Sequence, residues 1–354
     1  MPDPDIAREL VAAREIAATR WGVDGDVRAL PSYADLNFLI AADGARHVLK
    51  IAHPSWRREE LDLENQAMLT LAEREPALAW PAVRRTSDGA HLLTLTVDDV
   101  PRHVRLLGYV EGRVYAEAIA EVAPAQRPAL HRSLGAAVAR MARGLADFVH
   151  ESADRVHPWN LLQLPTLLDE IAHIDDAALR DRVDRHARAI CAQLPAWRAR
   201  LPIQVLHNDA NDLNVIVDCD ADGAPHVASI IDFGDMCTTF RIADLAIACT
   251  YAMQHESDPV ACARAVLAGY ESVQPLLPEE RALLQTFIVA RLCHSVLMAT
   301  RAWRLAPEND YILVSQQGVR ALLRLLTAPD APVVVPDAAV ADAQAPETPE
   351  NLHV

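Results

Sequence analysis

Two short segments in the second half of the chain carry residue types that can perform metal-assisted phosphoryl transfer. The first, VLHNDANDLNVIV, contains His207, Asp209 and Asn214 in the spacing H-x-D-x-x-x-x-N. The second, ASIIDFGDM, places Asp232 at the end of an apolar strand. One carboxylate can accept the proton of an attacking hydroxyl, while an amide oxygen and a second carboxylate can hold Mg²⁺, which takes oxygen ligands. We therefore expect Asp209 to be the catalytic base and Asn214 and Asp232 to be metal ligands.

A single lysine stands upstream of these segments. The chain has 33 basic residues, and Lys50 is the only one that is not arginine. Lys50 ends the predicted strand HVLK, and Glu64 lies in the helix that follows, with Glu60 and Asp62 as competing partners. We favour Glu64, because the apolar face of this helix directs it toward the sheet. In kinase catalytic centres, a strand lysine holds the nucleotide phosphates and a helix glutamate orients the lysine.

The elements that must position these residues divide into a β-rich beginning and a helical remainder. Apolar periodicity predicts a helix at 5–20, three strands at 27–33, 36–43 and 46–53 with a hairpin turn at Asp43-Gly44, a helix at 57–74, and a further hairpin of 82–89 and 91–98. Beyond an apolar crossing segment at 104–112, the prediction is helices at 113–121, 127–150, 163–174 and 176–200, a β region at 203–232, and helices near 241–254, 259–273, 278–302 and 309–327.

The chain resembles the aminoglycoside phosphotransferase and choline kinase superfamily, and within it the hydroxylysine-kinase-like group. The resemblance extends from about residue 5 to 327 and rests on LPSYADLNF, HVLKI, VRLLGYVEG, HNDANDLN, IIDFGDM, DLAIACTYA and PENDYILVSQQG. It implies an α+β fold of the two-lobed, protein-kinase-like type. Residues 1–105 would form a small β-rich N-lobe with one regulatory-type helix, and 106–328 a larger, mostly helical C-lobe. Residues 329–354, rich in Pro, Ala and acids, would be a disordered tail in which only VVV could dock.

The resemblance also implies where the nucleotide binds. Leu106, Leu107, Gly108 and Tyr109 would present backbone groups to the purine. The turn SYADLN has no glycine, so the phosphates would be covered by backbone amides, the Ser32 hydroxyl and Asn37 rather than by a glycine-rich loop. The donor would be ATP or GTP, with Mg²⁺ as the metal.

Further residues are candidates for the acceptor side of the site. His207 would brace the catalytic loop, with Asn211 beside it, and Asp235 would lie near the reactive end of the acceptor. Arg291 and His294 are three residues apart on one predicted helix, so they share a face and would bind an acceptor carboxylate or pack against another helix. Asp244 would either brace the catalytic loop or cap a helix, and Asn160 stands where relatives tend to carry an acid.

Composition limits the partners. A net charge of −16 with no basic run argues against nucleic acid and weakly favours a cationic ligand. The acidic beginning MPDPDIAREL is unlike a signal peptide, no apolar run reaches membrane-spanning length, and the six cysteines lack metal-finger spacing, so we expect a cytoplasmic protein with reduced thiols. The predicted activity is phosphorylation of a small, amine-bearing hydroxyl compound, such as hydroxylysine or an amino alcohol. The alternatives are an aminoglycoside phosphotransferase and a regulatory, nucleotide-binding pseudokinase.

Overall fold

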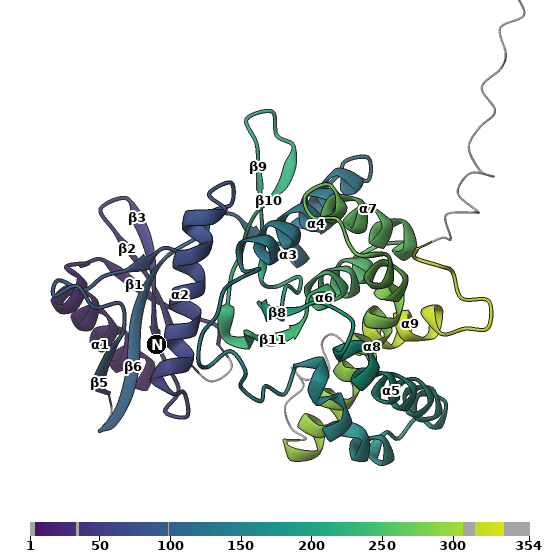
Figure 1. The fold of residues 1–354 in the computed structure, drawn as a ribbon. Helices are drawn as coiled ribbons and strands as arrows, with labels where there is room; N and C mark the ends of the chain where they lie inside the picture. Colours follow the sequence, from purple (N-terminus) through teal and green to yellow (C-terminus); the bar gives the residue numbers. More distant parts are fainter. Residues whose placement is uncertain (1–3, 33–34, 98, 307–315, 336–354) are drawn as a thin grey trace, which may run out of the picture.

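A six-stranded antiparallel sheet with two helices forms the first lobe (Figure 1). The computed structural model describes residues 4–32, 35–97, 99–306 and 316–335. The lobe consists of α1 (Pro4–Trp21), β1 (Asp26–Leu30), β2 (Leu36–Ala42), β3 (Ala45–Ile51), α2 (Arg58–Arg74), β4 (Val83–Arg84), β5 (Leu93–Val97) and β6 (Val100–Gly108). The strands lie in the order β1-β2-β3-β6-β4, and β5 also pairs with β6.

The β2–β3 hairpin confirms the predicted turn. Ala42 pairs with Ala45, and the two residues between them, Asp43 and Gly44, have φ angles of 50° and 76°. Left-handed backbone at both central positions is what a tight two-residue hairpin turn needs, and Asp-Gly supplies it readily. The same register places Asn37 opposite Lys50.

The pairing predicted for the last strands of this lobe is wrong. The segments 82–89 and 91–98 do not pair with each other, since β4 and β5 each pair with β6. The supposed crossing segment 104–112 begins as the buried second half of β6, which lies between β3 and β4. A strand covered on both faces is apolar without alternation, so its sequence does not show the period-two pattern of a half-exposed strand.

The second lobe is mostly helical and carries two small sheets. Its elements are β7 (Arg113–Val114), α3 (Tyr115–Glu121), α4 (Arg127–Gly144), the 3₁₀ helix η1 (Leu161–His173), α5 (Ala177–Arg198), β8 (Ile203–Leu206), β9 (Val215–Cys219), β10 (Pro225–Ile230), η2 (Phe233–Asp235), β11 (Cys237–Phe240), α6 (Ile242–Ala252), η3 (Met253–His255), α7 (Pro259–Glu271), α8 (Pro278–Leu305) and α9 (Gln316–Leu326). The sheets are β10-β9-β7 and β11-β8. The fold is therefore α+β, as predicted.

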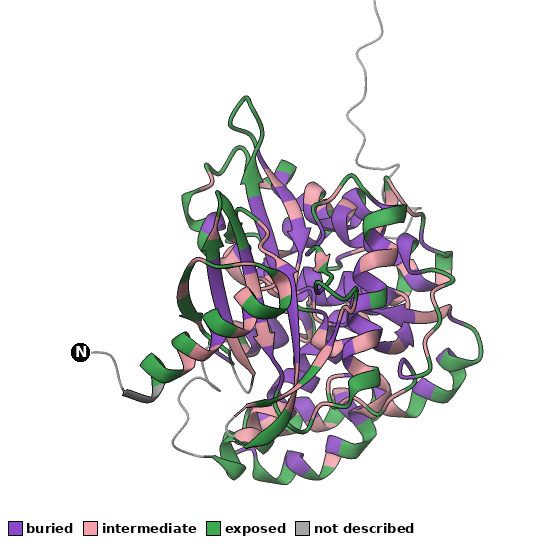
Figure 2. Ribbon diagram, turned by 90° about the vertical axis from the view of Figure 1, so that its left-hand side faces the viewer, coloured by how far each residue is buried: buried purple, intermediate pink, exposed green. Residues whose placement is uncertain are grey.

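Helix α8 runs through the centre of the second lobe. By length and composition it is the one helix in the described residues that could cross a membrane, but 67% of that apolar stretch is buried inside the protein. It packs against α5, α6, α9 and η1 (Figure 1). The buried residues gather in the interior of the protein, as the purple parts of the ribbon show (Figure 2). Its apolar character is accounted for by these contacts, as in a core helix of a globular domain.

The beginning of the predicted disordered tail is docked, which corrects that expectation for residues 329–335. The Val334 side chain is fully buried. Its amide donates to Gln285 Oε1 of α8 at 2.9 Å, and its carbonyl accepts from Arg264 Nε of α7 at 3.2 Å. The VVV segment thus docks without forming a strand, and residues 336–354 lie outside the described residues.

Candidate active site

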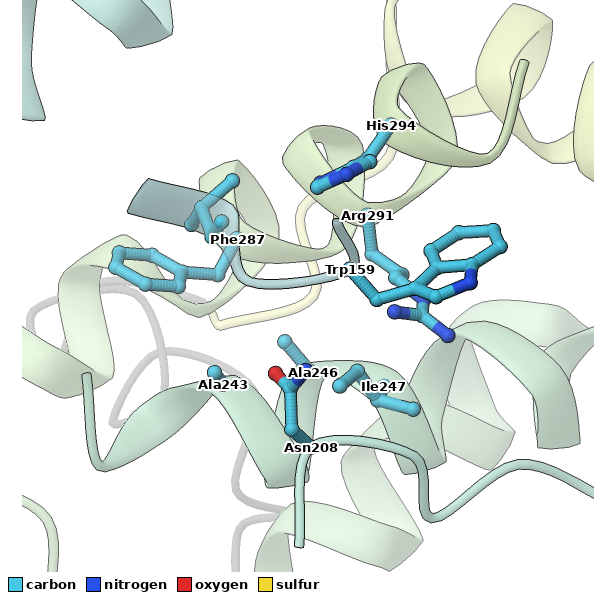
Figure 3. A pocket seen from close by; sticks show the side chains of 9 residues that line it. Trp159, Asn208, Ala243, Ala246, Ile247, Phe287, Arg291 and His294 are labelled. Carbon is cyan, nitrogen blue, oxygen red and sulfur yellow. The ribbon is translucent and has the colours of Figure 1, made fainter. Parts of the chain in front are cut away.

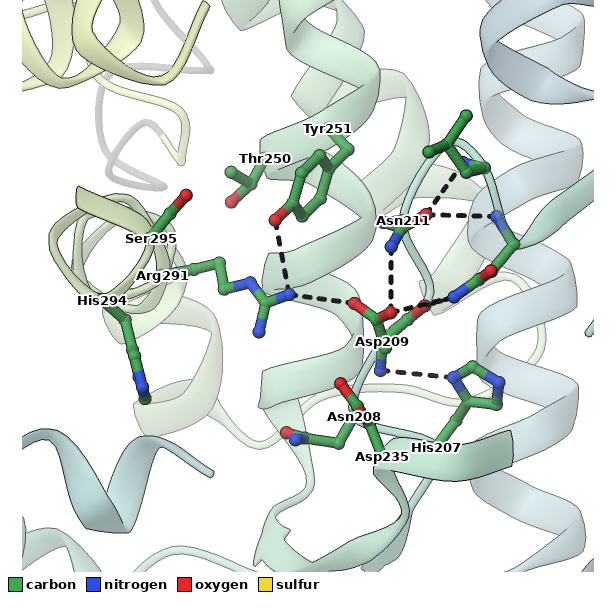
Figure 4. A network of polar contacts seen from close by, with 12 residues as sticks. His207, Asn208, Asp209, Asn211, Asp235, Thr250, Tyr251, Arg291, His294 and Ser295 are labelled. Atoms are coloured by element: carbon green, nitrogen blue, oxygen red, sulfur yellow. Dashed lines mark hydrogen bonds and ion pairs between the residues drawn. The ribbon is translucent and has the colours of Figure 1, made fainter. Parts of the chain in front are cut away.

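Asp209 lies on the loop between β8 and β9, and three side-chain donors hold its carboxylate (Figure 4). Its Oδ1 accepts a hydrogen bond from Arg291 Nη2 at 2.9 Å. Its Oδ2 accepts from the side-chain amides of Asn211 and Asn214, both at 2.9 Å. Burial raises the pKa of Asp209 to about 6, against the opposing effect of Arg291. A carboxyl group with a pKa near neutrality is suited to accept a proton during turnover.

The loop that carries Asp209 is braced from behind by Asp244. The Asp244 carboxylate accepts the backbone amides of His207 at 3.2 Å and Asn208 at 2.7 Å. His207 Nδ1 accepts the amide of Asp209, so its Nε2 donates to the carbonyl of Ile231 at 3.0 Å. Burial lowers the pKa of His207 to about 4, which keeps this ring neutral. Of the two roles considered for Asp244, the structure shows the bracing one, and His207 is structural as expected.

The two predicted metal ligands lie on adjacent backbone segments, because the Ile231 amide donates to the Asn214 carbonyl at 2.8 Å. The side-chain Nδ2 of Asn214 donates to both the carbonyl and the carboxylate of Asp209, and its side-chain oxygen has no hydrogen-bond partner in the described part of the chain, so it can face a cation. Asp232 has a left-handed φ of 63°, and Lys50 lowers the pKa of its carboxyl group. This pair of oxygen donors fits Mg²⁺, which commonly takes one or two protein ligands beside phosphate and water.

The predicted pairing of Lys50 with Glu64 is wrong. Lys50 Nζ lies 3.2 Å from Asp232 Oδ1, whereas Glu64 forms a buried ion pair with Arg105 of β6. Arg105 stands directly opposite Lys50 in the sheet, so both side chains leave the same face toward α2. Arg105 also donates to Asn65 at 3.1 Å. Sequence reasoning missed Arg105, although an arginine inside the apolar run VRLLG has to find a buried acid.

The predicted purine-binding segment has fewer free donors than expected. The Gly108 amide donates to the carbonyl of Ala82 at 2.7 Å, and the Tyr109 amide donates to the carbonyl of Arg46 at 3.0 Å. Neither amide is therefore available to a purine in this arrangement. Leu106 and Leu107 are buried in the sheet.

Of the predicted phosphate-covering residues, Ser32 lies between β1 and β2, and Asn37 lies at the beginning of β2. Ser32 is exposed next to residues 33–34, which are outside the described residues. The side-chain oxygen of Asn37 is buried without a hydrogen-bond partner in the described residues, beside Lys50. This places Asn37 and Lys50 together, as the sequence suggested.

A second group of residues surrounds Asp235. Burial and the neighbouring Asp209 raise the pKa of Asp235 well above its usual range. His157 Nε2 lies 3.4 Å from its carboxylate, and burial lowers the pKa of His157 to about 4. Arg155 donates to the carbonyls of Gly234 and Met236 and so holds the segment around Asp235. Sequence reasoning did not identify His157 or Arg155 as site residues, because they come from the irregular loop before η1.

A pocket lies next to Asp209, between the catalytic loop, α6, α8 and the beginning of η1 (Figure 3). Its cavity volume is about 20 Å³, and it is open on one side. Nine residues line it: Trp159, Leu161, Asn208, Ala243, Ala246, Ile247, Phe287, Arg291 and His294. This volume takes one small polar group of a ligand, and the rest of the ligand would lie outside the open mouth.

The two candidates on α8 have different roles in this pocket. The guanidinium of Arg291 lies between the rings of Trp159, at 4.4 Å, and Tyr251, at 5.5 Å. His294 Nε2 bonds the carbonyl of Pro158 at 2.8 Å, and its ring stacks on Trp159. Burial lowers the pKa of His294 to about 3, so this ring carries no charge at neutral pH. Arg291 is therefore the charged group of the pocket, and His294 positions Trp159. Asn160 is structural, since its amide donates to the carbonyl of Thr238.

Comparisons with known proteins show what this chain is similar to. The pattern of the phosphotransferase enzyme family, APH, matches residues 26–283. Hydroxylysine kinase of Mus musculus is 28% identical over 312 residues, which are 82% of this chain and 81% of that protein. Among solved structures, the microcompartment-associated aminopropanol kinase aligns with a TM-score of 0.63 at 16% identity, covering 94% of this chain and all of that one. Amicoumacin kinase in complex with AMP-PNP, Ca²⁺ and its antibiotic aligns with a TM-score of 0.63 at 16% identity, covering 90% and 96%.

Proposed function

Because this chain belongs to the phosphotransferase enzyme family, whose members act on hydroxyl groups, we propose that it is a Mg²⁺-dependent small-molecule kinase. It transfers the γ-phosphoryl group of ATP or GTP to the hydroxyl of an amine-bearing metabolite, with hydroxylysine or an amino alcohol as the leading acceptors. The likeness to hydroxylysine kinase supports the first acceptor, and the fold shared with aminopropanol kinase is compatible with the second.

The arrangement of donors around Asp209 carries this proposal. Each carboxylate oxygen can accept about two hydrogen bonds. Oδ2 already accepts from Asn211 and Asn214, whereas Oδ1 accepts only from Arg291 among the described residues. The remaining acceptor position of Asp209 is therefore on Oδ1, and the acceptor hydroxyl donates its proton there as its oxygen attacks the phosphorus.

The other residues serve the phosphate end. Asn214 and Asp232 would hold the metal, and Lys50 would contact the nucleotide phosphates. When bound, Mg²⁺ neutralises phosphate charge and orients the transferred group. Binding nucleotide requires Lys50 to exchange part of its contact with Asp232 for phosphate, so Lys50 and Asp232 act as one unit.

An acceptor screen with the variant Asp209→Asn tests the proposal. The parent protein should phosphorylate at least one acceptor from a panel of hydroxylated amino acids, amino alcohols and aminoglycosides, and only with Mg²⁺ present. Asp209→Asn should bind nucleotide normally and lose ~10²–10⁴-fold in turnover, the usual contribution of a general base. Asp184→Asn, which removes an exposed carboxylate of α5, is the matched control and should be unaffected.

The same screen separates the alternatives. Transfer confined to aminoglycosides would make the protein an antibiotic-modifying kinase. Nucleotide binding without transfer to any acceptor would make it a pseudokinase. Turnover of Asp209→Asn within threefold of the parent would show that another group is the base.

A further inference from the structure

The pocket beside Asp209 contains three buried hydrogen-bond donors that have no partner in the described residues. They are Nε and Nη1 of Arg291 and the side-chain Nδ2 of Asn208. Arg291 is only 6% exposed and Asn208 only 1% exposed, and both line the pocket. Buried donors normally have partners, because leaving one unpaired is unfavourable, especially on a charged group. The pocket is therefore built for a group that accepts hydrogen bonds.

The position of these donors is fixed by the surrounding structure. In Figure 4 the contacts of Arg291 all leave from a single nitrogen, Nη2, which donates to Asp209 and lies 3.3 Å from the Tyr251 hydroxyl. The rings of Trp159 and Tyr251 hold the plane of the guanidinium. Asn208 has a left-handed φ of 65°, and its backbone amide donates to the carboxylate of Asp244. Both side chains are therefore held in place before a ligand enters.

The chemistry of the lining selects the charge of that ligand. Arg291 is the only charged residue among those that line the pocket in the described part of the chain, and no acid is among them. His294 is neutral and bonds a backbone carbonyl. The other walls are apolar: Leu161, Ala243, Ala246, Ile247 and Phe287. A small anion on a short apolar stem matches these walls and the three unpaired donors, whereas an ammonium group would find no carboxylate among the described residues that line the pocket.

We propose that this pocket binds the carboxylate of the acceptor through Arg291 and Asn208, so that the acceptor is a hydroxylated amino acid and not an amino alcohol. This rests on the proposed kinase function and names its substrate class. Arg291 then serves the acceptor at two points. Its Nη2 holds Oδ1 of Asp209, where the hydroxyl donates its proton, and its Nε and Nη1 hold the carboxylate. One guanidinium sets the distance between the reacting hydroxyl and the anchored end of the substrate.

Matched acceptors give the first test. Hydroxylysine is compared with the diamino alcohol that lacks only its carboxylate, and homoserine with aminopropanol, which differs from it in the same way. In the pair that the parent enzyme phosphorylates faster, the amino acid should exceed the amino alcohol by on the order of 10- to 100-fold in kcat/KM. This is the range that hydrogen bonds to a charged group contribute. Equal use of both members, or preference for the amino alcohol, would overturn the proposal.

Two variants locate the preference. Asn208→Asp is nearly isosteric, tolerates the left-handed backbone and places a carboxylate opposite the substrate's own, so it should raise KM selectively for the amino acid. Arg291→Lys keeps the charge but removes the fork, so it should lower turnover of both acceptors through Asp209 and lower that of the amino acid further. Arg304→Lys changes an arginine of the same helix that pairs with Glu170 at the surface, and it should change neither acceptor. If both pocket variants lower the two acceptors by the same factor, the carboxylate is not bound there.

Binding without chemistry separates this inference from the kinase proposal. Lysine has the amino-acid end of hydroxylysine but no hydroxyl to be phosphorylated, and cadaverine lacks the carboxylate as well. Calorimetric titration should show that the parent protein binds lysine more tightly than cadaverine and that Asn208→Asp removes the difference. Selective lysine binding in a protein that phosphorylates nothing would leave the carboxylate site standing and refute the kinase. Transfer to a hydroxyl without any selectivity for the carboxylate would do the reverse.

Discussion

The polar side chains around Asp209 each use part of their bonding capacity within the protein and keep part for a ligand. Among the described residues, Asp209 keeps one acceptor position on Oδ1 and Asn214 keeps its side-chain oxygen. Lys50 lies 3.2 Å from Asp232, a contact that in our proposal it shares with nucleotide phosphate. Because these groups are partly paired before anything binds, the site is ordered in advance and little rearrangement is needed. At this scale, changing the shape of one group at constant charge should be as damaging as removing it.

Lys50→Arg should fold normally and lose on the order of 10- to 10³-fold in turnover efficiency. An ammonium is a compact point charge, whereas a guanidinium is a planar fork that cannot occupy the same place without displacing the phosphates. Steady-state kinetics with a thermal melt measures both properties. Arg28→Lys, the reverse exchange at an exposed position of β1 in the same sheet, is the control and should be silent. Combining Lys50→Arg with Asp232→Asn should be far less damaging than the sum of the two. Full activity of the Lys50→Arg enzyme would show that Lys50 does not contact the phosphates as proposed.

The buried neutral ring of His294 predicts a pH-dependent stability difference. At pH 7, His294→Gln should be less stable than the parent, because the stacking on Trp159 and the bond to Pro158 are weakened. The folded-state pKa of about 3 lies below the usual value of 6.5, so protons bind the unfolded parent more readily as the pH falls. Parent stability is therefore lost below pH 6.5, and the gap between the two proteins should narrow by about 1.4 kcal/mol per pH unit toward pH 4. Urea unfolding at several pH values measures this gap, and a constant gap would show that His294 is not buried as a neutral ring.

At the scale of elements, helix α2 has charged contacts with both lobes. Glu64 near its middle pairs with Arg105 of the sheet. Glu60 in its first turn lies 3.7 Å from Arg155, which also holds the carbonyl of Gly234 in the segment after Asp232. Arg155 therefore links α2 to the segment Asp232–Gly234, whereas Lys50 contacts Asp232 without pairing with an acid of α2.

Glu64→Ala should act on stability before it acts on catalysis. Removing one partner leaves the Arg105 charge buried and unpaired, which typically costs about 3–5 kcal/mol. Replacing both residues by leucine should recover much of that loss, since an apolar pair needs no partner. Chemical denaturation of the two single variants and the double variant measures this cycle. Unchanged stability of Glu64→Ala together with lost turnover would instead favour the original pairing with Lys50.

At the scale of the whole molecule, residues of both lobes form the candidate active site. A different segment, residues 329–335, packs on the second lobe away from that site. Lys50 comes from the N-terminal sheet, and Asp209 and Asp232 from the C-terminal lobe. Residues 329–335 close the second lobe by docking Val334 against α7 and α8. Contacts this far from the site should stabilise the lobe without changing the chemistry.

Val334→Ala tests this separation between stability and activity. The side chain is 0% exposed, so the loss of buried methyl groups should lower the free energy of unfolding by about 1–2 kcal/mol, with kcat/KM unchanged. The neighbouring Val333 is 53% exposed, and Val333→Ala should stay within about 0.5 kcal/mol of the parent. Thermal melts of both variants measure the contrast, and two equal melts would mean that the segment does not dock.

The sequence by itself determined the chemistry and most of the elements. The spacing of His207, Asp209 and Asn214 ahead of Asp232 depends on residue types along one continuous stretch of backbone, and such local patterns can be recognised without the fold. Strand and helix periodicity likewise come from neighbouring residues, so the β2–β3 hairpin and most helices were predicted within a few residues of their observed bounds. The exceptions are the helix predicted at 127–150, which ends at Gly144, the segment 163–174, which is a 3₁₀ helix, and the helix predicted at 309–327, of which the described residues show Gln316–Leu326. Strand β6 was not predicted, because burial on both faces removes the alternation of apolar and polar residues along its second half.

Only the tertiary structure decided which charges pair. The sequence offered three acids as partners for Lys50: Glu60, Asp62 and Glu64. In the folded chain Glu64 pairs with Arg105, which stands opposite Lys50 on the same face of the sheet, and Lys50 lies beside Asp232. The same holds for Arg291, which comes to Asp209 across 82 residues of chain, and for Asn208, whose donor is unpaired only in the folded pocket. Pairing between distant charges depends on distance and burial in three dimensions, and neither quantity is present in the order of residues along the chain.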